Sequence, residues 1–349
     1  MRYTIRSVAC EPGLGSLLLT FDLAGGIDVF RMLLATIVLS VAVPALAKGP
    51  QPVPTKPVTS KQLAIAPRLQ WVDRAGYCGE CSIQQCALFY GNYVSQSVCR
   101  QIIDPTQEQD VLVQVNIDQV LVALRLTYEE FDSTETPVPQ YQKYLAWTKR
   151  HLHDEHPVIM TMYMQDETAR DYDHIVLATG FAAAKVETYH SADVLYFNDL
   201  FQTKLQKRSF SSLHDTRAMQ GNGARHQFCI PRDYNFGCAI TGIQDETKSL
   251  LPIRIKLDRE DEPDTVQHEP AATLSLQITV RGLQPGQEYV LYRYDNYENL
   301  PTRAYHSSKP LSKRTFVAKE AQQEFTDECQ SSGAAYYRCL LAPAANAEK

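Results

Sequence analysis

The sequence has 349 residues, of which 44% are hydrophobic and 21% charged, a composition typical of globular proteins with about two domains. The formal net charge is −6, and lysines and arginines are scattered along the chain. We therefore expect no basic stripe of the kind that binds nucleic acid.

The N-terminal region resembles a secretory signal. Arg31 precedes the apolar run MLLATIVLSVAVPALA at 32–47, which ends in small residues. The run is short for a membrane span, which needs about 20 apolar residues. We expect an N-terminal extension and signal over 1–47, a secreted protein, and no stable membrane insertion after cleavage. An uncleaved anchor or a buried helix is the alternative.

The proline-rich, polar segment 48–67 is predicted to be an extended linker. After it, apolar residues recur at helical spacing, and later segments are short and rich in β-branched and aromatic residues. The predicted helices cover 83–90, 116–131 and 141–152, and the predicted strands cover 157–164, 174–181, 194–201 and 229–243. Helices followed by strands indicate an α+β domain, which we place at 68–245.

The remaining segment, 246–349, is predicted to be a β-sandwich. Apolar and polar residues alternate in LPIRIKL, LSLQITVRGL and EYVLYRYD, and turns rich in Pro and Gly separate them. Cys329 and Cys339 flank a predicted turn, and we expect a disulfide between them. Eight cysteines follow Ala47, so full pairing is compatible with the count.

Three residues have the chain order of a cysteine hydrolase. Cys78 stands at the start of the first predicted helix, where the helix dipole favours a thiolate and lowers the thiol pKa. His174 opens a predicted strand, and Asp199 ends the next one, directly after Asn198. A nucleophile, a base and a group that orients the base are the parts that such catalysis needs.

The stretches YCGECS, DHIVLATG and YFNDL together resemble the papain-like cysteine peptidases. The likeness is strongest to the branch that includes bacteriocin-leader-processing peptidases and phytochelatin synthase, and it covers about 70–240. It implies a papain-like domain, with N-terminal helices followed by an antiparallel sheet.

The resemblance also implies roles for individual residues. Cys78 would be the nucleophile, His174 the general base and acid, and Asp199 the group that orients the imidazole, with Asn198 in reserve. Gln70 resembles the glutamine that helps to form the oxyanion hole. It lies eight residues before Cys78, two more than is usual in that family.

Other assignments stay open. Cys81 is a rival nucleophile, because CGEC also resembles the Cys-Gly-X-Cys of papain, and both cysteines are structural in a third interpretation. HLHDEH at 151–156 is expected to be a solvated turn rather than a metal site. We expect no metal and no cofactor.

These features predict a secreted cysteine hydrolase that cleaves peptides or proteins through a thioester. An acyl transferase on the same fold would use the same triad. A secreted binding protein on a papain-like scaffold is a third hypothesis.

Overall fold

The computed structural model describes residues 59–71, 76–135, 140–165, 171–214, 228–230, 235–258 and 272–343. These residues belong to one compact unit that spans Pro52–Lys349. The signal expected at 32–47 lies outside the described residues. The boundary expected between 245 and 246 stays a prediction.

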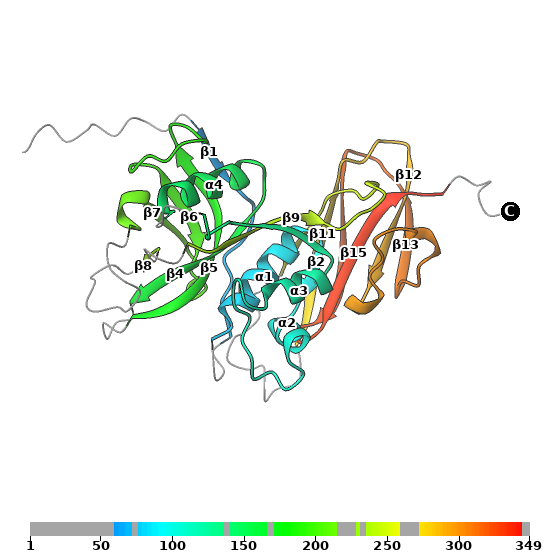
Figure 1. The fold of residues 1–349 in the computed structure, drawn as a ribbon. Coiled ribbons are helices and arrows are strands. Elements are labelled where there is room, and N and C mark those ends of the chain that lie inside the picture. The colour runs from blue at the N-terminus through cyan, green and yellow to red at the C-terminus, as the bar shows by residue number, and fades with distance from the viewer. Residues whose placement is uncertain are drawn as a thin grey trace, which may run out of the picture. The chain divides into compact units, whose positions relative to one another are not determined.

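An antiparallel sheet forms the centre of the N-terminal half (Figure 1). Its strands run in the order β3-β9-β4-β5-β6-β7, while β1 pairs with β5 and β8 with β4. The bounds are β1 Thr59–Gln62, β3 Leu126–Glu130, β4 Val158–Gln165, β5 Asp171–Ala183, β6 Val194–Asn198, β7 Leu205–Ser209, β8 Phe228–Cys229 and β9 Gly237–Ile243. The predicted strands of this region therefore share one sheet.

In the part of the chain that the structure describes, four α-helices accompany this sheet. They are α1 Cys78–Phe89, α2 Gln96–Ile103, α3 Ile117–Ala123 and α4 Tyr141–His153. Both α1 and α4 pack against β5, and their apolar faces enter one continuous core (Figure 1). The architecture is thus mixed, with helices and mainly antiparallel strands, in agreement with the α+β prediction at this level.

The helix predicted over 116–131 is wrong in its second half. The helix α3 ends at Ala123, and Arg125 adopts a positive φ of 56°, which a continuing helix cannot contain. From Leu126 the chain forms β3, which pairs with β9. Thr127 and Tyr128 favour a strand, and the change of direction at Arg125 lets them join the sheet edge.

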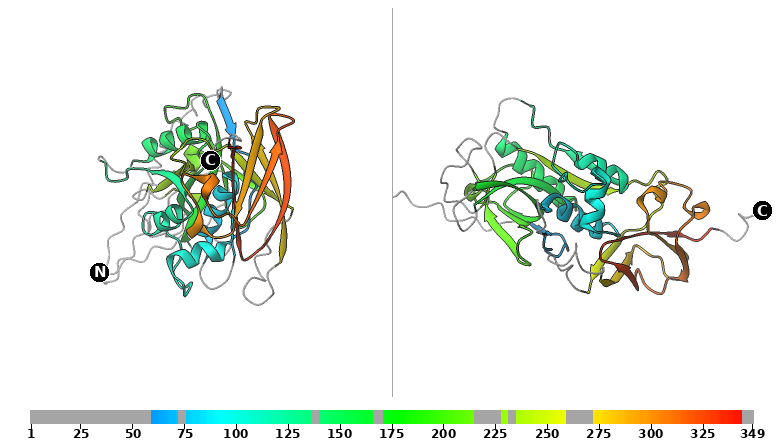
Figure 2. Two further views of the ribbon diagram at one scale, coloured as in Figure 1. Left: turned by 90° about the vertical axis from the view of Figure 1, so that its right-hand side faces the viewer. Right: turned by 90° about the horizontal axis from the view of Figure 1, so that it is seen from below.

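The C-terminal part contains two smaller antiparallel sheets (Figure 2). One has the order β10-β11-β14, and the other has the order β13-β12-β15-β2. The bounds are β2 Asn92–Val94, β10 Ile253–Leu257, β11 Thr273–Arg281, β12 Glu288–Tyr294, β13 Ser312–Val317, β14 Gln322–Gln330 and β15 Ala334–Leu341. Alternate side chains of both sheets share a second core, as expected of a sandwich.

One strand of this C-terminal part comes from far upstream in the sequence. β2 directly follows α1, and it pairs with β15 through Asn92–Tyr336 and Val94–Ala334. Tyr93 and Val94 are fully buried there. The three-residue strand is too short to be recognised from periodicity, so the sequence interpretation missed it.

The linker expected over 48–67 ends earlier than predicted. Residues 59–62 form β1, which pairs with residues 180–183 of β5, and Leu63 and Ile65 are buried in the core. Gly180 makes this possible, because a Cβ there would lie 2.4 Å from the Lys61 carbonyl oxygen. Burial of apolar side chains thus holds the second half of the segment on the sheet.

The disulfide expected between Cys329 and Cys339 is not formed. Cys329 lies on β14, opposite Leu274, and Cys339 lies on β15, opposite Leu291, so the two belong to different sheets. No disulfide joins any of the eight cysteines in the described residues. Both side chains are instead buried within the core of the sandwich.

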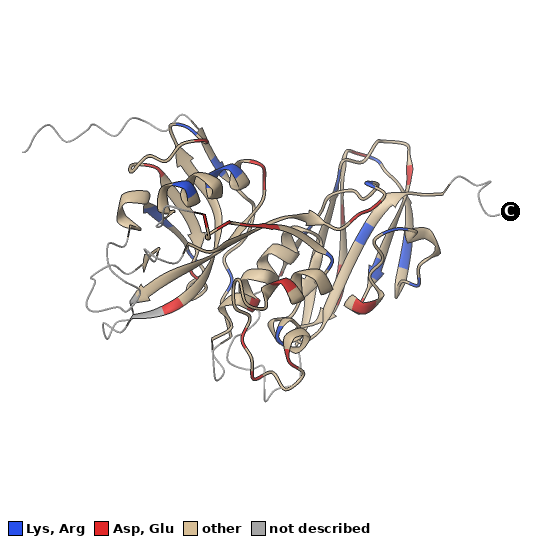
Figure 3. Cartoon of the chain, in the orientation of Figure 1, with Lys and Arg blue, Asp and Glu red and all other residues tan. Residues whose placement is uncertain are grey.

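Charged residues of both signs occur in most parts of the described ribbon (Figure 3). Among the described residues, no helix is long and apolar enough to cross a membrane.

We expect titration of the denatured protein with a thiol reagent, without reductant, to count at least the eight cysteines that form no disulfide here. Reductant should leave the thermal midpoint unchanged, because no cross-link is lost. A midpoint that falls by several degrees on reduction would contradict this.

Candidate active site

Cys78 is the first residue of α1 and is only partly buried. The next residue, Gly79, allows a close approach of the loop before α3, because a Cβ there would lie 2.4 Å from the Val111 carbonyl oxygen. Glycine after the cysteine therefore has a packing reason. It brings the start of α1 against Val111.

A buried ion pair fixes this helix start. The Glu80 carboxylate accepts a hydrogen bond from Arg100 Nε at 2.7 Å and another from the Val111 N–H at 3.1 Å. The side chains are 0% and 2% exposed. Burial raises the pKa of Glu80, while the bonds to Arg100 lower it. Two helices and the 110–113 loop are thus tied together at one carboxylate.

The same arginine also holds the residues just before Cys78. Arg100 Nη2 donates to the Gly76 carbonyl at 2.7 Å and lies 2.9 Å from Asp110 Oδ1. Its guanidinium stacks over the Tyr77 ring, 3.4 Å from the ring centre. One side chain therefore positions the chain on both sides of the nucleophile candidate.

His174 lies on β5 and is 3% exposed. Its Nε2 is 2.7 Å from the backbone oxygen of Asp199. A carbonyl can only accept, so Nε2 carries the proton and Nδ1 is the acceptor nitrogen. Phe201 stacks on the imidazole at 4.8 Å between ring centres, and it shields this bond from water.

Asp199 contacts His174 through its backbone and not through its carboxylate. The carboxylate accepts from the N–H groups of Phe201 and Gln202, and from the amides of Gln202 and Gln206. It shapes the turn that presents the carbonyl. The sequence predicted a contact between Asp199 and the imidazole, but the atom in contact is the backbone oxygen and not the carboxylate.

Gln70 lies beside the same turn. Its N–H donates to the Leu200 carbonyl at 2.9 Å, and Leu200 has a positive φ of 66°. A Cβ at Gly76 would lie 3.8 Å from the Gln70 amide nitrogen, so this side chain lies next to the residues that precede Cys78. The long spacing between Gln70 and Cys78 therefore still leaves Gln70 near the helix start.

The thiol is neutral at ordinary pH. Burial raises the pKa of Cys78 to about 11, although hydrogen bonds from the backbone N–H groups of Ile175 and Gly79 oppose the shift. The pKa of Cys78 is therefore raised and not lowered as expected, because burial outweighs these two hydrogen bonds. The Ile175 contact places the sulfur beside the backbone of the residue that follows His174.

The imidazole is neutral as well. Burial lowers the pKa of His174 to about 4, and the bond to the Asp199 carbonyl opposes this only in part. Near neutral pH the site therefore holds a thiol and a neutral imidazole rather than an ion pair.

The rival candidates have other partners. Cys81 is 0% exposed, and its sulfur lies 3.8 Å from the Arg68 carbonyl oxygen and 3.7 Å from Gln85 Nε2. Asn198 Nδ2 donates to Gln85 Oε1 at 2.6 Å. These contacts fasten α1 to the end of β6. They place Cys81 and Asn198 in the structural support of the site.

Two of the three histidines of 151–156, His151 and His156, form a pair. The Nδ1 atoms of His151 and His156 are 3.3 Å apart, and Glu129 lies 3.5 Å from His151 Nε2. The described residues contain no group of three or more side chains that could hold a metal ion. Burial lowers the pKa of both histidines, so they are neutral at pH 7.

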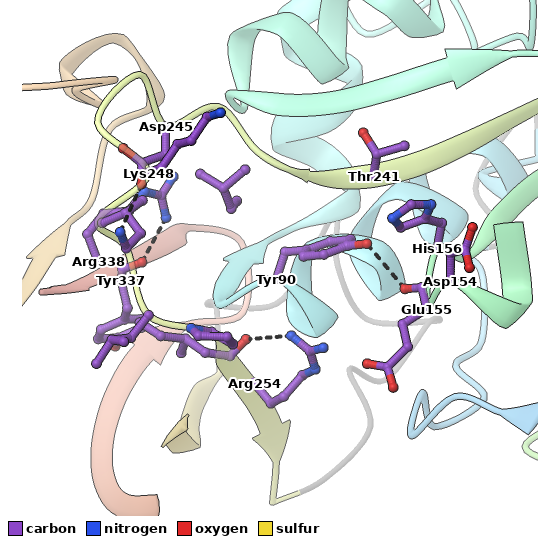
Figure 4. Close-up of a pocket in the computed structure, with 15 residues that line it drawn as sticks. Tyr90, Asp154, Glu155, His156, Thr241, Asp245, Lys248, Arg254, Tyr337 and Arg338 are labelled. Atoms are coloured by element: carbon purple, nitrogen blue, oxygen red, sulfur yellow. Dashed lines mark hydrogen bonds between the residues drawn. The ribbon is translucent and has the colours of Figure 1, made fainter. Parts of the chain in front are cut away.

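A cavity of about 460 Å³ lies beside this pair (Figure 4). Its described lining contains Tyr90, His156, Arg254 and Arg338, but neither Cys78 nor His174. Positive and negative side chains are both represented, so the cavity favours no ligand charge. We assign it no role in the chemistry.

Sequence reasoning missed Glu80, Arg100 and Phe201. Glu80 lies inside the motif, but nothing in its pattern distinguishes a buried carboxylate from an exposed one. Arg100 lies 20 residues further on, a separation at which no periodicity links two residues.

No protein-family model matches this sequence, and the search of curated proteins found no match.

We expect Glu80→Gln to lower the free energy of unfolding by about 3 kcal/mol, because it leaves Arg100 buried without its main partner. Lys61→Met is the control, since it removes an exposed pair with Glu155 and should cost less than about 1 kcal/mol. Urea unfolding measures both. Equal losses of unfolding free energy would show that the buried Glu80–Arg100 pair stabilises the fold no more than an exposed pair does.

We expect alkylation of Cys78 to be slow near neutral pH and to accelerate toward pH 11. Relative to a thiol with the usual pKa of 9.0, the thiolate fraction is lower by roughly 10². Greater nucleophilicity offsets part of this, so the rate should be about tenfold lower. Site-resolved mass spectrometry of iodoacetamide adducts measures it.

The same peptide from denatured protein provides the reference rate. Fast, selective labelling of Cys78 at pH 6 would contradict the expectation and would indicate a preformed thiolate–imidazolium pair.

Proposed function

We propose that this chain is a secreted cysteine hydrolase that cleaves peptide bonds through a thioester on Cys78. The observation that supports it best is the bond from His174 Nε2–H to the Asp199 carbonyl. It fixes the tautomer in which Nδ1 can accept a proton. His174 also precedes Ile175, whose backbone N–H contacts the thiol of Cys78. A base held in one tautomer near a nucleophile is the arrangement that nucleophilic catalysis needs.

The reaction begins with proton transfer from the Cys78 thiol to His174 Nδ1. The sulfur attacks the substrate carbonyl carbon, and the imidazolium then gives its proton to the leaving amine as the C–N bond breaks. Water, deprotonated by the same imidazole, hydrolyses the thioester and restores the thiol. The Asp199 carbonyl accepts from Nε2–H throughout and stabilises the transient positive charge.

The tetrahedral intermediate carries an oxyanion that needs donors. The first N–H groups of α1 have no partner within the helix, and in this proposal the Cys78 N–H is the first donor. The Gln70 amide nitrogen is the second donor. Its side chain is 7% exposed.

The papain-like relationship also belongs to this proposal. It is supported by the cysteine at the start of α1 and the histidine on β5 of the antiparallel sheet, most of whose strands follow α4 in the chain. The run at 32–47 supports secretion. The sandwich supplies surface for a protein substrate.

The same fold and the same three residues are compatible with two other functions. An acyl transferase would use the same steps, with an amine in place of water. A binding protein without turnover is favoured by one observation, the raised pKa of Cys78, because it makes the resting thiol a poor nucleophile.

We expect Cys78→Ala to lower cleavage of a mixed quenched-peptide library by about 10³-fold or more, since no other group can form the thioester. His174→Gln should act similarly, while Cys81→Ala should retain cleavage because that thiol is fully buried and cannot reach a substrate. Intact mass after treatment with a peptidyl acyloxymethyl ketone should show one adduct, on Cys78.

Cleavage that survives Cys78→Ala, or an adduct on Cys81, would overturn the assignment. Product analysis with added hydroxylamine separates hydrolysis from transfer. If the wild-type protein neither cleaves peptides nor forms an adduct, the binding hypothesis replaces the hydrolase.

A further inference from the structure

A second, larger hollow of about 700 Å³ borders the sandwich. One wall is the segment 63–66 that follows β1, and the other is formed by the consecutive residues 254–258 at β10. Leu88 and Phe89 of α1 contribute apolar surface between them. Two extended backbones thus border one groove, which we call the β10 groove.

β10 is the edge strand of its sheet. Only β11 pairs with it among the described strands. Arg281 N–H donates to the Pro252 carbonyl and Asp258 N–H to the Ser275 carbonyl, at 2.9 and 3.2 Å. Bonded positions alternate in an antiparallel ladder, so the N–H and C=O groups of 255 and 257 point away from β11. An added strand could pair with them.

The rim of the groove is positively charged. Arg254, Lys256 and Arg281 line it, and none of the three forms an ion pair with a described residue. Asp258 is the one acid in its described lining, and its carboxylate already accepts from the Ser275 N–H. Lys256 and Arg281 are exposed, so their charges are available.

We propose that the β10 groove binds an extended acidic peptide as an added strand on β10. The backbone of the peptide pairs with the outward groups of 255 and 257. Because side chains alternate along a strand, acidic residues of the peptide meet Lys256 and Arg281 while the residues between them meet the apolar wall at Leu63 and Leu88. The preferred sequence therefore alternates acidic and apolar residues.

This site is separate from the proposed chemistry. The described lining of the β10 groove contains none of Cys78, His174 and Asp199. Binding there does not depend on turnover, so a Cys78→Ala protein should bind the peptide as the wild type does. The failure of one proposal is thus distinguishable from the failure of the other.

The test is fluorescence anisotropy with a short labelled peptide in which Glu alternates with Val. We expect saturable binding that weakens with salt, and no binding of the matched Lys–Val peptide. Lys256→Glu and Arg281→Glu should each lower affinity about threefold to tenfold. Lys313→Glu, an exposed lysine on the edge strand β13, is the matched control and should change nothing.

Backbone pairing is tested by the same peptide with N-methyl groups on alternate amides. Methylation in the register that faces β10 should abolish binding, and methylation in the other register should not. Equal binding of the Lys–Val peptide, indifference to Lys256→Glu, or no binding of either peptide would overturn the proposal. Binding of oleate in place of the peptide would assign the groove to an anionic amphiphile instead.

Discussion

The buried pair of Glu80 and Arg100 is the constraint on which the candidate site depends. A carboxylate and a guanidinium removed from water are costly unless they are bonded to each other, and here the arginine also reaches Gly76, Asp110 and the Tyr77 ring. The residues around Cys78 therefore have one low-energy arrangement. A surface pair would leave the same residues free to move.

Desolvation determines the protonation states of Cys78 and His174. The same packing that fixes Cys78 and His174 removes water from both, and loss of hydration favours the neutral form of each group. The Ile175 N–H acts in the opposite direction on Cys78 but is weaker.

Regular periodicity in the sequence was sufficient to predict α1, α4 and most strands of the large sheet. It failed where the local conformation depends on tertiary contacts. Arg125 ends α3 early, and β2 is stable only because β15 lies beside it. The order of Cys78, His174 and Asp199 indicated a site, but the turn at Leu200 determines that a carbonyl faces the imidazole. Cysteine parity suggested a disulfide, although parity carries no information about which sheet a cysteine enters.

The pairing of β2 with β15 connects the C-terminal strands to the region that contains α1. A chain cut near 245 would leave Asn92–Val94 as an isolated strand with its apolar side chains uncovered, directly after the helix that begins at Cys78. Exposed strand edges of this kind recruit other chains and aggregate. Neither part is therefore expected to keep its fold when it is separated from the other.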